Sequence, residues 1–138
     1  MNQETAFADT YYYLAIMNPR DNAHSRAMVI GGQVQGPIVT SAWVLQEVAD
    51  GLADPTTRGS FLRLLSALES DPQTSIIGPT ESLWRGGIDL YRSRPDKGWS
   101  LTDCISFVVM KDRGITNALT ADHHFEQAGF VAMLKATS

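Results

Sequence analysis

The sequence predicts an α/β fold in which helices cover both faces of a parallel sheet of about five strands. Short apolar segments alternate along the chain with longer segments whose apolar residues recur at helical spacing. Glycine, proline or a helix-capping residue separates most of these segments. Strands that are joined through helices pair in parallel by right-handed crossovers, so we expect a three-layer α/β/α arrangement.

Residues 5–8, Thr-Ala-Phe-Ala, form a short apolar run that is typical of a buried strand. The segment 11–17 follows with helical character, and Asn18-Pro19 ends it because the residue before a proline disfavours the helical conformation. A turn then leads into a second helical segment at about residues 23–33. The chain therefore begins with a strand and two helices.

A second unit starts with the strand at 38–40, Ile-Val-Thr, which Gly36-Pro37 introduces. Ser41 is a natural N-cap for the next helix. Pro55 suits the first turn of a further helix, whose apolar residues repeat until Asp71-Pro72. The first of these two helices has one apolar stripe, formed by Val44, Leu45, Val48 and Leu52.

The second half of the chain repeats this alternation. Residues 75–77 predict a third strand, and a helix carrying Leu83, Trp84, Ile88 and Tyr91 follows it. After a polar loop, Ser100 caps a helix that ends near Gly114. The remaining expected elements are a strand at 117–121, a short helix at 123–127 and a strand at 130–134.

With 138 residues the chain has the length of one domain, so we expect a single domain over residues 1–138. Hydrophobic residues make up 43% and charged residues 19%, as in an ordinary globular protein. No apolar run approaches the roughly 20 residues of a membrane span, and the N-terminus does not resemble a secretory signal. The single cysteine, Cys104, excludes an internal disulfide. We therefore expect a cytoplasmic protein.

Four carboxylates lie where expected strands end or expected helices begin. Asp9 follows the first strand and Asp122 the fourth, Asp103 lies in the first turn after Ser100, and Glu47 borders the core on its helix. The carboxyl ends of parallel strands share one edge, which is where ligands bind in open α/β sheets. Several ionised carboxylates gathered there need a countercharge, and oxygen ligands favour Mg²⁺ or Mn²⁺ over zinc. This pattern predicts a metal-dependent hydrolase.

Each acid also has a purely structural interpretation. Asp9 and Asp122 can serve as helix N-caps, Asp103 can complete a capping box with Ser100, and Glu47 can be a solvent-facing helix residue. A zinc site at His123-His124 is disfavoured, because adjacent residues point in different directions on a helix. The joint placement of the acids, more than any single one, indicates a site.

The formal net charge of −4 argues against a protein that coats nucleic acid with bulk positive charge. A local cluster of cations can still contact a phosphate backbone. The alternative is a solvated helix face and loop. The candidates lead up to Asp103 and are Arg85, Arg92, Arg94 and Lys97.

Four segments, 7–10, 43–48, 99–104 and 119–125, resemble in order and spacing the four acidic motifs of PIN-domain ribonucleases, especially bacterial VapC-type toxins and their stand-alone relatives. The resemblance covers nearly the whole chain. It implies an α/β/α fold and Mg²⁺- or Mn²⁺-dependent cleavage of RNA. The residues at the positions of the family's metal ligands are Asp9, Glu47, Asp103 and Asp122.

The resemblance also implies supporting hydroxyl residues at Thr10 and Thr102, a small antitoxin partner that blocks the acidic groove, and a homodimer. One departure is Tyr11, because the family often has a small hydroxyl residue two places after the first acid. Two alternatives are a phosphoacceptor or signalling domain and a PIN domain that binds RNA or protein without cutting. The first fits poorly, since receivers pair two acids after the first strand and Thr10 follows Asp9 here.

Overall fold

The computed structural model describes residues 4–136. A five-stranded sheet with the order β3-β2-β1-β4-β5 forms its centre, and every pair of neighbouring strands is parallel. The strands are β1 (Ala6–Ala8), β2 (Ile38–Ser41), β3 (Thr74–Ile77), β4 (Asn117–Leu119) and β5 (Val131–Ala132). The helices are α1 (Thr10–Met17), α2 (His24–Gln33), α3 (Ala42–Gly51), α4 (Arg58–Ser70), α5 (Glu81–Ser93), α6 (Leu101–Asp112) and α7 (His123–Gln127).

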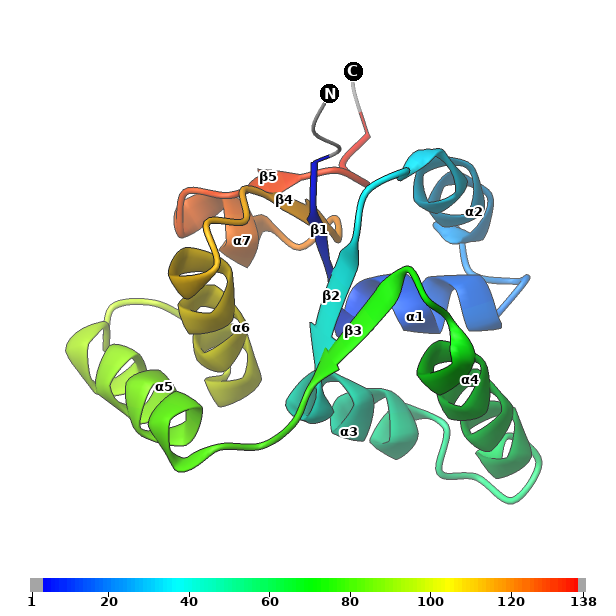
Figure 1. Ribbon diagram of the computed structural model, residues 1–138, viewed down its shortest axis with the longest axis horizontal. Helices are drawn as coiled ribbons and strands as arrows, with labels where there is room; N and C mark the ends of the chain where they lie inside the picture. Colours follow the sequence, from blue (N-terminus) through cyan, green and yellow to red (C-terminus); the bar gives the residue numbers. More distant parts are fainter. Residues whose placement is uncertain (1–3, 137–138) are drawn as a thin grey trace.

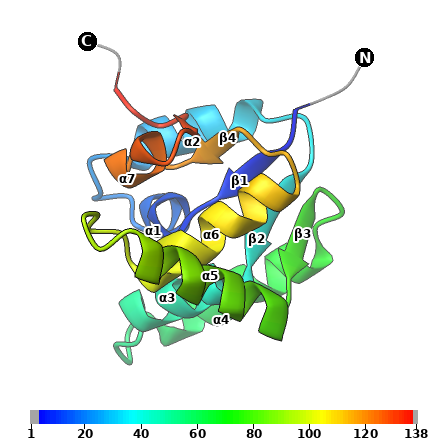
Figure 2. The same ribbon diagram turned by 90° about the vertical axis from the view of Figure 1, so that its left-hand side faces the viewer.

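Helices lie on both sides of the sheet. In Figure 1, α5, α6 and α7 are to the left of the strands, whereas α1, α2 and α4 are to the right. Figure 2 looks onto the first group and shows α5 and α6 side by side in front of the sheet. This arrangement confirms the expected three-layer α/β fold with five parallel strands.

Strand β1 lies at the centre of the sheet, and all three of its residues are buried. Phe7 is in register with Val39 on one side and with Ala118 on the other. Such continuous apolar strands are required where helices cover both faces. From β1 the chain continues outward through β2 and β3, and later through β4 and β5 on the opposite side. The switch point therefore lies between β1 and β4, at whose carboxyl ends a ligand site is expected.

Helices α5 and α6 pack closely because a glycine permits it. Gly87 is buried in α5, and a side chain there would collide with Ile105 of α6. The start of α6 is fixed by a capping box at Ser100 and its end by Gly114, whose φ of 65° suits glycine. These contacts hold the first turn of α6 at the edge of the sheet where the strands end.

The boundaries of three elements differ clearly from the sequence predictions. Pro55 does not lie inside a helix: α4 begins at Arg58, and Asp54 instead accepts a hydrogen bond from the Thr56 amide, which makes a turn. Strand β4 ends at Leu119, two residues earlier than expected, because the Thr120 amide bonds to the carbonyl of Ala118. Strand β5 is similarly short. Within residues 4–136, no helix is long and apolar enough to cross a membrane.

Candidate active site

Asp9 leaves the end of β1 at the switch point and is almost fully buried, with 5% of its surface exposed. It occupies the N-cap position of α1, yet its side chain makes no capping hydrogen bond. Its Oδ2 atom instead accepts a hydrogen bond of 2.9 Å from the hydroxyl of Thr120, which follows β4. The capping interpretation of Asp9 is therefore correct for its position but not for a side-chain capping hydrogen bond, and the carboxylate faces the neighbouring strand end.

Burial raises the pKa of Asp9 to about 7. The hydroxyl of Thr120 and the nearby amides of α1 oppose this change, because they favour the charged form. The negative charge of Asp103 raises the pKa of Asp9 further, so the two carboxylates repel each other across the site. A cation among them would lower the pKa of Asp9, because an opposite charge favours the ionised form.

Thr120 joins two of the acids. While its hydroxyl donates to Asp9, the same oxygen accepts a hydrogen bond of 3.1 Å from the amide of Asp122. The Asp122 carboxylate in turn caps α7, accepting from the amide of His124 at 2.9 Å. The capping interpretation of Asp122 is thus confirmed, but the carboxylate remains half-buried at the site and has a second oxygen free for a ligand.

Asp103 completes the capping box of α6, as one interpretation of the sequence predicted. Its Oδ2 atom accepts from the amide of Ser100, and its own amide donates to the Ser100 hydroxyl, both at 3.0 Å. Burial, and then the charge of Asp122, raise the pKa of Asp103, whereas the Ser100 amide and His124 lower it. Asp103 therefore has a structural function and also contributes charge to the site.

Glu47 lies on α3, half-buried, and its Oε1 atom accepts a 2.6 Å hydrogen bond from the hydroxyl of Thr10. Because Thr10 directly follows Asp9, this contact attaches α3 to the first acid. Glu47 is therefore not a plain solvent-facing residue. Thr102 is half-buried in the first turn of α6, and within residues 4–136 no hydrogen bond joins its hydroxyl to the acids.

Together these side-chain and backbone contacts connect all four acids across five elements or their ends. Thr10 joins Glu47 to the residue after β1, Thr120 joins Asp9 to Asp122, and His124 joins Asp122 to Asp103. Sequence reasoning did not single out Thr120, and it considered His124 only in a disfavoured zinc site. Thr120 supplies the hydroxyl partner of the first acid, the role that Tyr11 does not fill. Only their position beside Asp122 signalled them.

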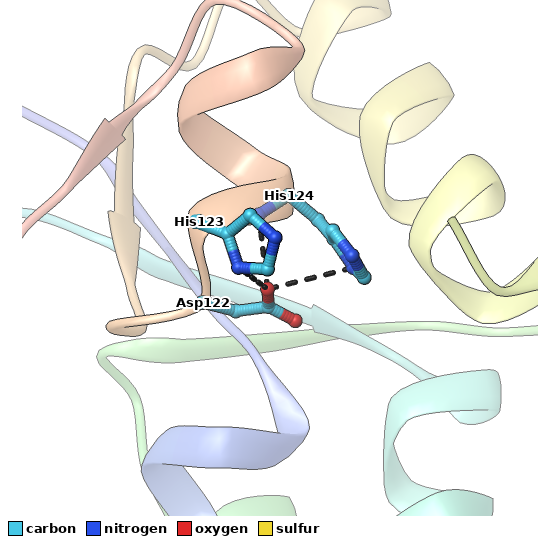
Figure 3. A group of neighbouring side chains, drawn as sticks. All are labelled: Asp122, His123 and His124. Carbon is cyan, nitrogen blue, oxygen red and sulfur yellow. Dashed lines mark hydrogen bonds and ion pairs between the residues drawn. The ribbon is translucent and has the colours of Figure 1, made fainter. Parts of the chain in front are cut away.

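His124 lies between two acids and is itself largely buried. Its Nδ1 atom is 3.1 Å from Asp103 Oδ2 and 3.5 Å from Asp122 Oδ1. His123 also turns its Nδ1 toward Asp122 Oδ1, at 3.6 Å (Figure 3). The two rings lie 4.5 Å apart between centroids. The expectation that these adjacent histidines diverge is wrong, because they are the first two residues after the N-cap Asp122 and both turn their Nδ1 atoms toward its carboxylate.

Within residues 4–136, Asp122, His123 and His124 are the group of three possible metal ligands whose ligand atoms all lie within 4.8 Å of one another. The acids approach one another less closely, through the intervening hydroxyls and imidazole. The donor set of the whole site, mainly carboxylate oxygen, fits a hard divalent cation, with imidazole nitrogen available on the α7 side.

The four cations proposed for nucleic-acid contact lie on α5 and in the loop before α6. Arg85 is 3.8 Å from Glu81 and Arg92 is 3.5 Å from Asp89. Arg94 forms a two-point ion pair with Asp96 and lies over the ring of Trp99. Lys97 has no ion pair within the described part of the chain. Of these four cations, three thus have an acidic partner, and Lys97 has none within residues 4–136.

Comparison with known proteins agrees with this architecture. Over 130 residues, the chain is 27% identical to the "23S rRNA-specific endonuclease VapC20" of Mycobacterium tuberculosis, covering 91% of this chain and 95% of the relative. The crystal structure of that organism's VapC20, described as a sarcin-ricin loop cleaving toxin, superposes with a TM-score of 0.85 and 25% identity. The match covers 96% of this chain and 99% of that one.

Two more distant structures share the fold. FitAcB from Neisseria gonorrhoeae gives a TM-score of 0.63 at 19% identity, covering 92% of this chain and 94% of that one. VapBC2 from Rickettsia felis, bound to a promoter DNA fragment, gives 0.64 at 14% identity, covering 93% and 96%. The profile of the PIN domain matches residues 6–131. The family assignment confirms the predicted class, that of a metal-dependent ribonuclease of VapC type, and argues against a phosphoacceptor domain. The chain belongs to the PIN-domain family.

Proposed function

We propose that the chain hydrolyses RNA phosphodiester bonds at the site formed by Asp9, Glu47, Asp103 and Asp122. The observation that carries this proposal is the continuous set of contacts that links these acids at the switch point of the sheet. A module that only binds RNA gains nothing from buried carboxylates, since they repel phosphate. The whole of residues 1–138 acts in this proposal as one nuclease domain.

The side chains have distinct tasks in this mechanism. When bound by the acids, a divalent cation supplies Lewis acidity and compensates the charge that develops on the phosphate. Asp9 must be ionised to take part, and the Thr120 hydroxyl holds its carboxylate in one orientation. The Ser100 amide and His124 do the same for Asp103. Thr10 fixes Glu47. Among the described residues 4–136, the hydroxyl of Thr102 makes no comparable contact with an acid.

Replacing Asp9 or Asp103 with asparagine tests the proposal. We expect the wild type to cut a labelled hairpin RNA when Mg²⁺ or Mn²⁺ is added, and each variant to lose at least about 100-fold in rate, because a charged ligand is removed. Asp50→Asn is a matched control, since Asp50 lies exposed on α3 beyond Glu47; it should cut within about twofold of wild type. Undiminished cleavage by the folded Asp9 and Asp103 variants would contradict the proposal.

The imidazoles beside Asp122 bear on the choice of metal. Mg²⁺ prefers oxygen ligands, whereas Mn²⁺ accepts nitrogen more readily. We infer that Mn²⁺ binds more tightly than Mg²⁺ and that His123→Ala weakens Mn²⁺ binding several-fold while Mg²⁺ binding changes little. Calorimetric titration of each ion measures this. Equal losses for the two ions would show that His123 does not select between them.

The substrate and partners are proposed from relatives. Because the similar VapC20 is described as specific for 23S rRNA and as cleaving the sarcin-ricin loop, a ribosomal RNA hairpin is the first substrate to assay. Resemblance to VapC-type toxins also supports a small antitoxin that occupies the acidic groove, and a homodimer. Co-expression with the product of an adjacent small reading frame tests the former: an antitoxin should co-purify and suppress cleavage.

A further inference from the structure

A pocket lies between the end of α5, the loop that follows and the first turn of α6, with a volume of about 720 Å³. This volume is within the range of small-molecule sites. Its lining includes Gly98, and a side chain added there would come within 3.8 Å of His124 Nε2. It also includes Cys104, the neighbour of Asp103. The pocket therefore adjoins the acids at the start of α6.

Two aromatic residues of different exposure line this pocket. Trp99 is buried, with 6% of its surface exposed, and its indole N–H donates to Gln127 at 3.0 Å. Tyr91, at the end of α5, is 53% exposed. Trp99 is thus committed to packing, whereas the ring of Tyr91 remains available to a ligand. A nucleobase is a ligand that stacks on such a ring.

The charge of the pocket is opposite to that of the adjoining acids. Arg92, Arg94 and Lys97 line it, and the two arginines are paired with Asp89 and Asp96. Since Lys97 has no ion pair within residues 4–136, these five groups leave one positive charge in excess. Carboxylates repel a phosphate chain, so a cation one step from the acids is needed to hold the chain there.

We propose that this pocket binds one unpaired nucleotide of the RNA next to the phosphate that is cut. Its base stacks on Tyr91, its phosphate pairs with Lys97, and the backbone passes over Gly98, where no side chain obstructs the path to the acids. The substrate is accordingly RNA with an unstacked nucleotide at the cleavage position, in a single strand or a loop. A base in a continuous duplex cannot enter.

This inference rests on the proposed function, which directs the RNA backbone from the pocket to the acids, but RNA binding can be measured without cleavage. The protein carries Asp9→Asn and the buffer contains a chelator, so that no turnover occurs. Fluorescence anisotropy then reports the affinity for a labelled 12-nucleotide single strand and for the same sequence in a duplex. Thermal melting verifies that variants of Tyr91 and Lys97 are folded, which we expect because Tyr91 is exposed and Lys97 is half-buried in the loop after α5.

We expect Lys97→Ala to weaken single-strand binding at least about fivefold and to reduce the slope of log affinity against log salt by about 0.7, as for one phosphate contact. Tyr91→Leu should also weaken it at least about fivefold, whereas Tyr91→Phe, which keeps the ring, should not. Lys111→Ala is the matched control: Lys111 is an exposed lysine at the other end of α6 and should change affinity less than twofold.

The inference is overturned if Lys97→Ala and Tyr91→Leu bind RNA as tightly as their controls, or if the duplex binds as tightly as the single strand. It is also overturned if an acidic peptide competes with RNA, if this competition is lost in Lys97→Ala, and if Tyr91→Leu has no effect. The last result would assign the pocket to a protein segment. Failure of the nuclease proposal gives a different result from failure of this inference. In that case the wild type would not cut RNA, although Lys97→Ala and Tyr91→Leu would still weaken RNA binding.

Discussion

The two ends of the acid cluster are built differently. Asp9 follows the central strand β1 and occupies the N-cap position of α1 without a side-chain capping hydrogen bond, so its position depends on the register of the buried sheet. Asp103 and Asp122 both complete the N-termini of helices, α6 and α7. Acids of one site thus affect the stability of the fold differently. The buried charge of Asp9 destabilises the folded state, whereas Asp103 and Asp122 stabilise the helices on which they lie.

The largest effect that tests this contrast is the pH dependence of stability. The pKa of Asp9 is about 7 in the folded chain and 3.8 as the reference value. Between these values the folded state holds a proton that the unfolded state has lost, so the contribution of Asp9 to stability is highest below pH 4 and is lost as the pH rises through 7. The loss amounts to at most about 4 kcal/mol. Burial raises the pKa of Asp103 too, which acts in the same direction.

Urea denaturation in chelator, at pH values from 4 to 8, measures this loss. Asp9→Asn should remove most of it, making the variant more stable than the wild type at pH 8 and similar at pH 4. Added Mn²⁺ should stabilise the wild type at pH 8, because it binds only the folded site, by about 2.7 kcal/mol at 100 times its dissociation constant. A wild type whose stability does not decrease with pH would show that the Asp9 carboxylate is not destabilising.

The second effect concerns the α6 end of the site. Ser100→Ala removes one half of the capping box and leaves the Asp103 carboxylate, so we expect a loss of about 1 kcal/mol in the free energy of unfolding with most of the cleavage retained. Asp103→Ala should lose similar or greater stability and nearly all cleavage. Thermal melting and RNA cleavage of the two variants side by side distinguish capping from catalysis. If Ser100→Ala and Asp103→Ala lost cleavage equally, the loss in Asp103→Ala would be explained by the missing helix cap alone.

The sequence predicted this contrast only in part, for physical reasons. Strand ends and capping residues are local features, so β1, the helix begun by Ser100 and the joint placement of the acids were predictable. The orientation of the Asp9 side chain depends on Thr120, which follows β4 and comes within hydrogen-bonding distance only once β1 and β4 pair. The convergence of His123 and His124 depends on the chain direction at the start of α7, which spacing alone did not reveal.

The smallest expected effect is at Thr10, between the two ends of the cluster. Thr10→Val keeps the shape of the side chain but removes the hydroxyl that donates to Glu47, so Glu47 loses its orientation without losing its charge. We expect cleavage to fall about tenfold, the lower end of effects for groups that orient a metal ligand. Thr10→Ser, which keeps the donor, should remain within about twofold of wild type. Because Thr10 is only half-buried and α1 does not depend on its hydroxyl, melting temperatures should stay nearly constant. Equal cleavage by the valine and serine variants would show that the packing of α3 alone positions Glu47, just as the register of the sheet positions Asp9.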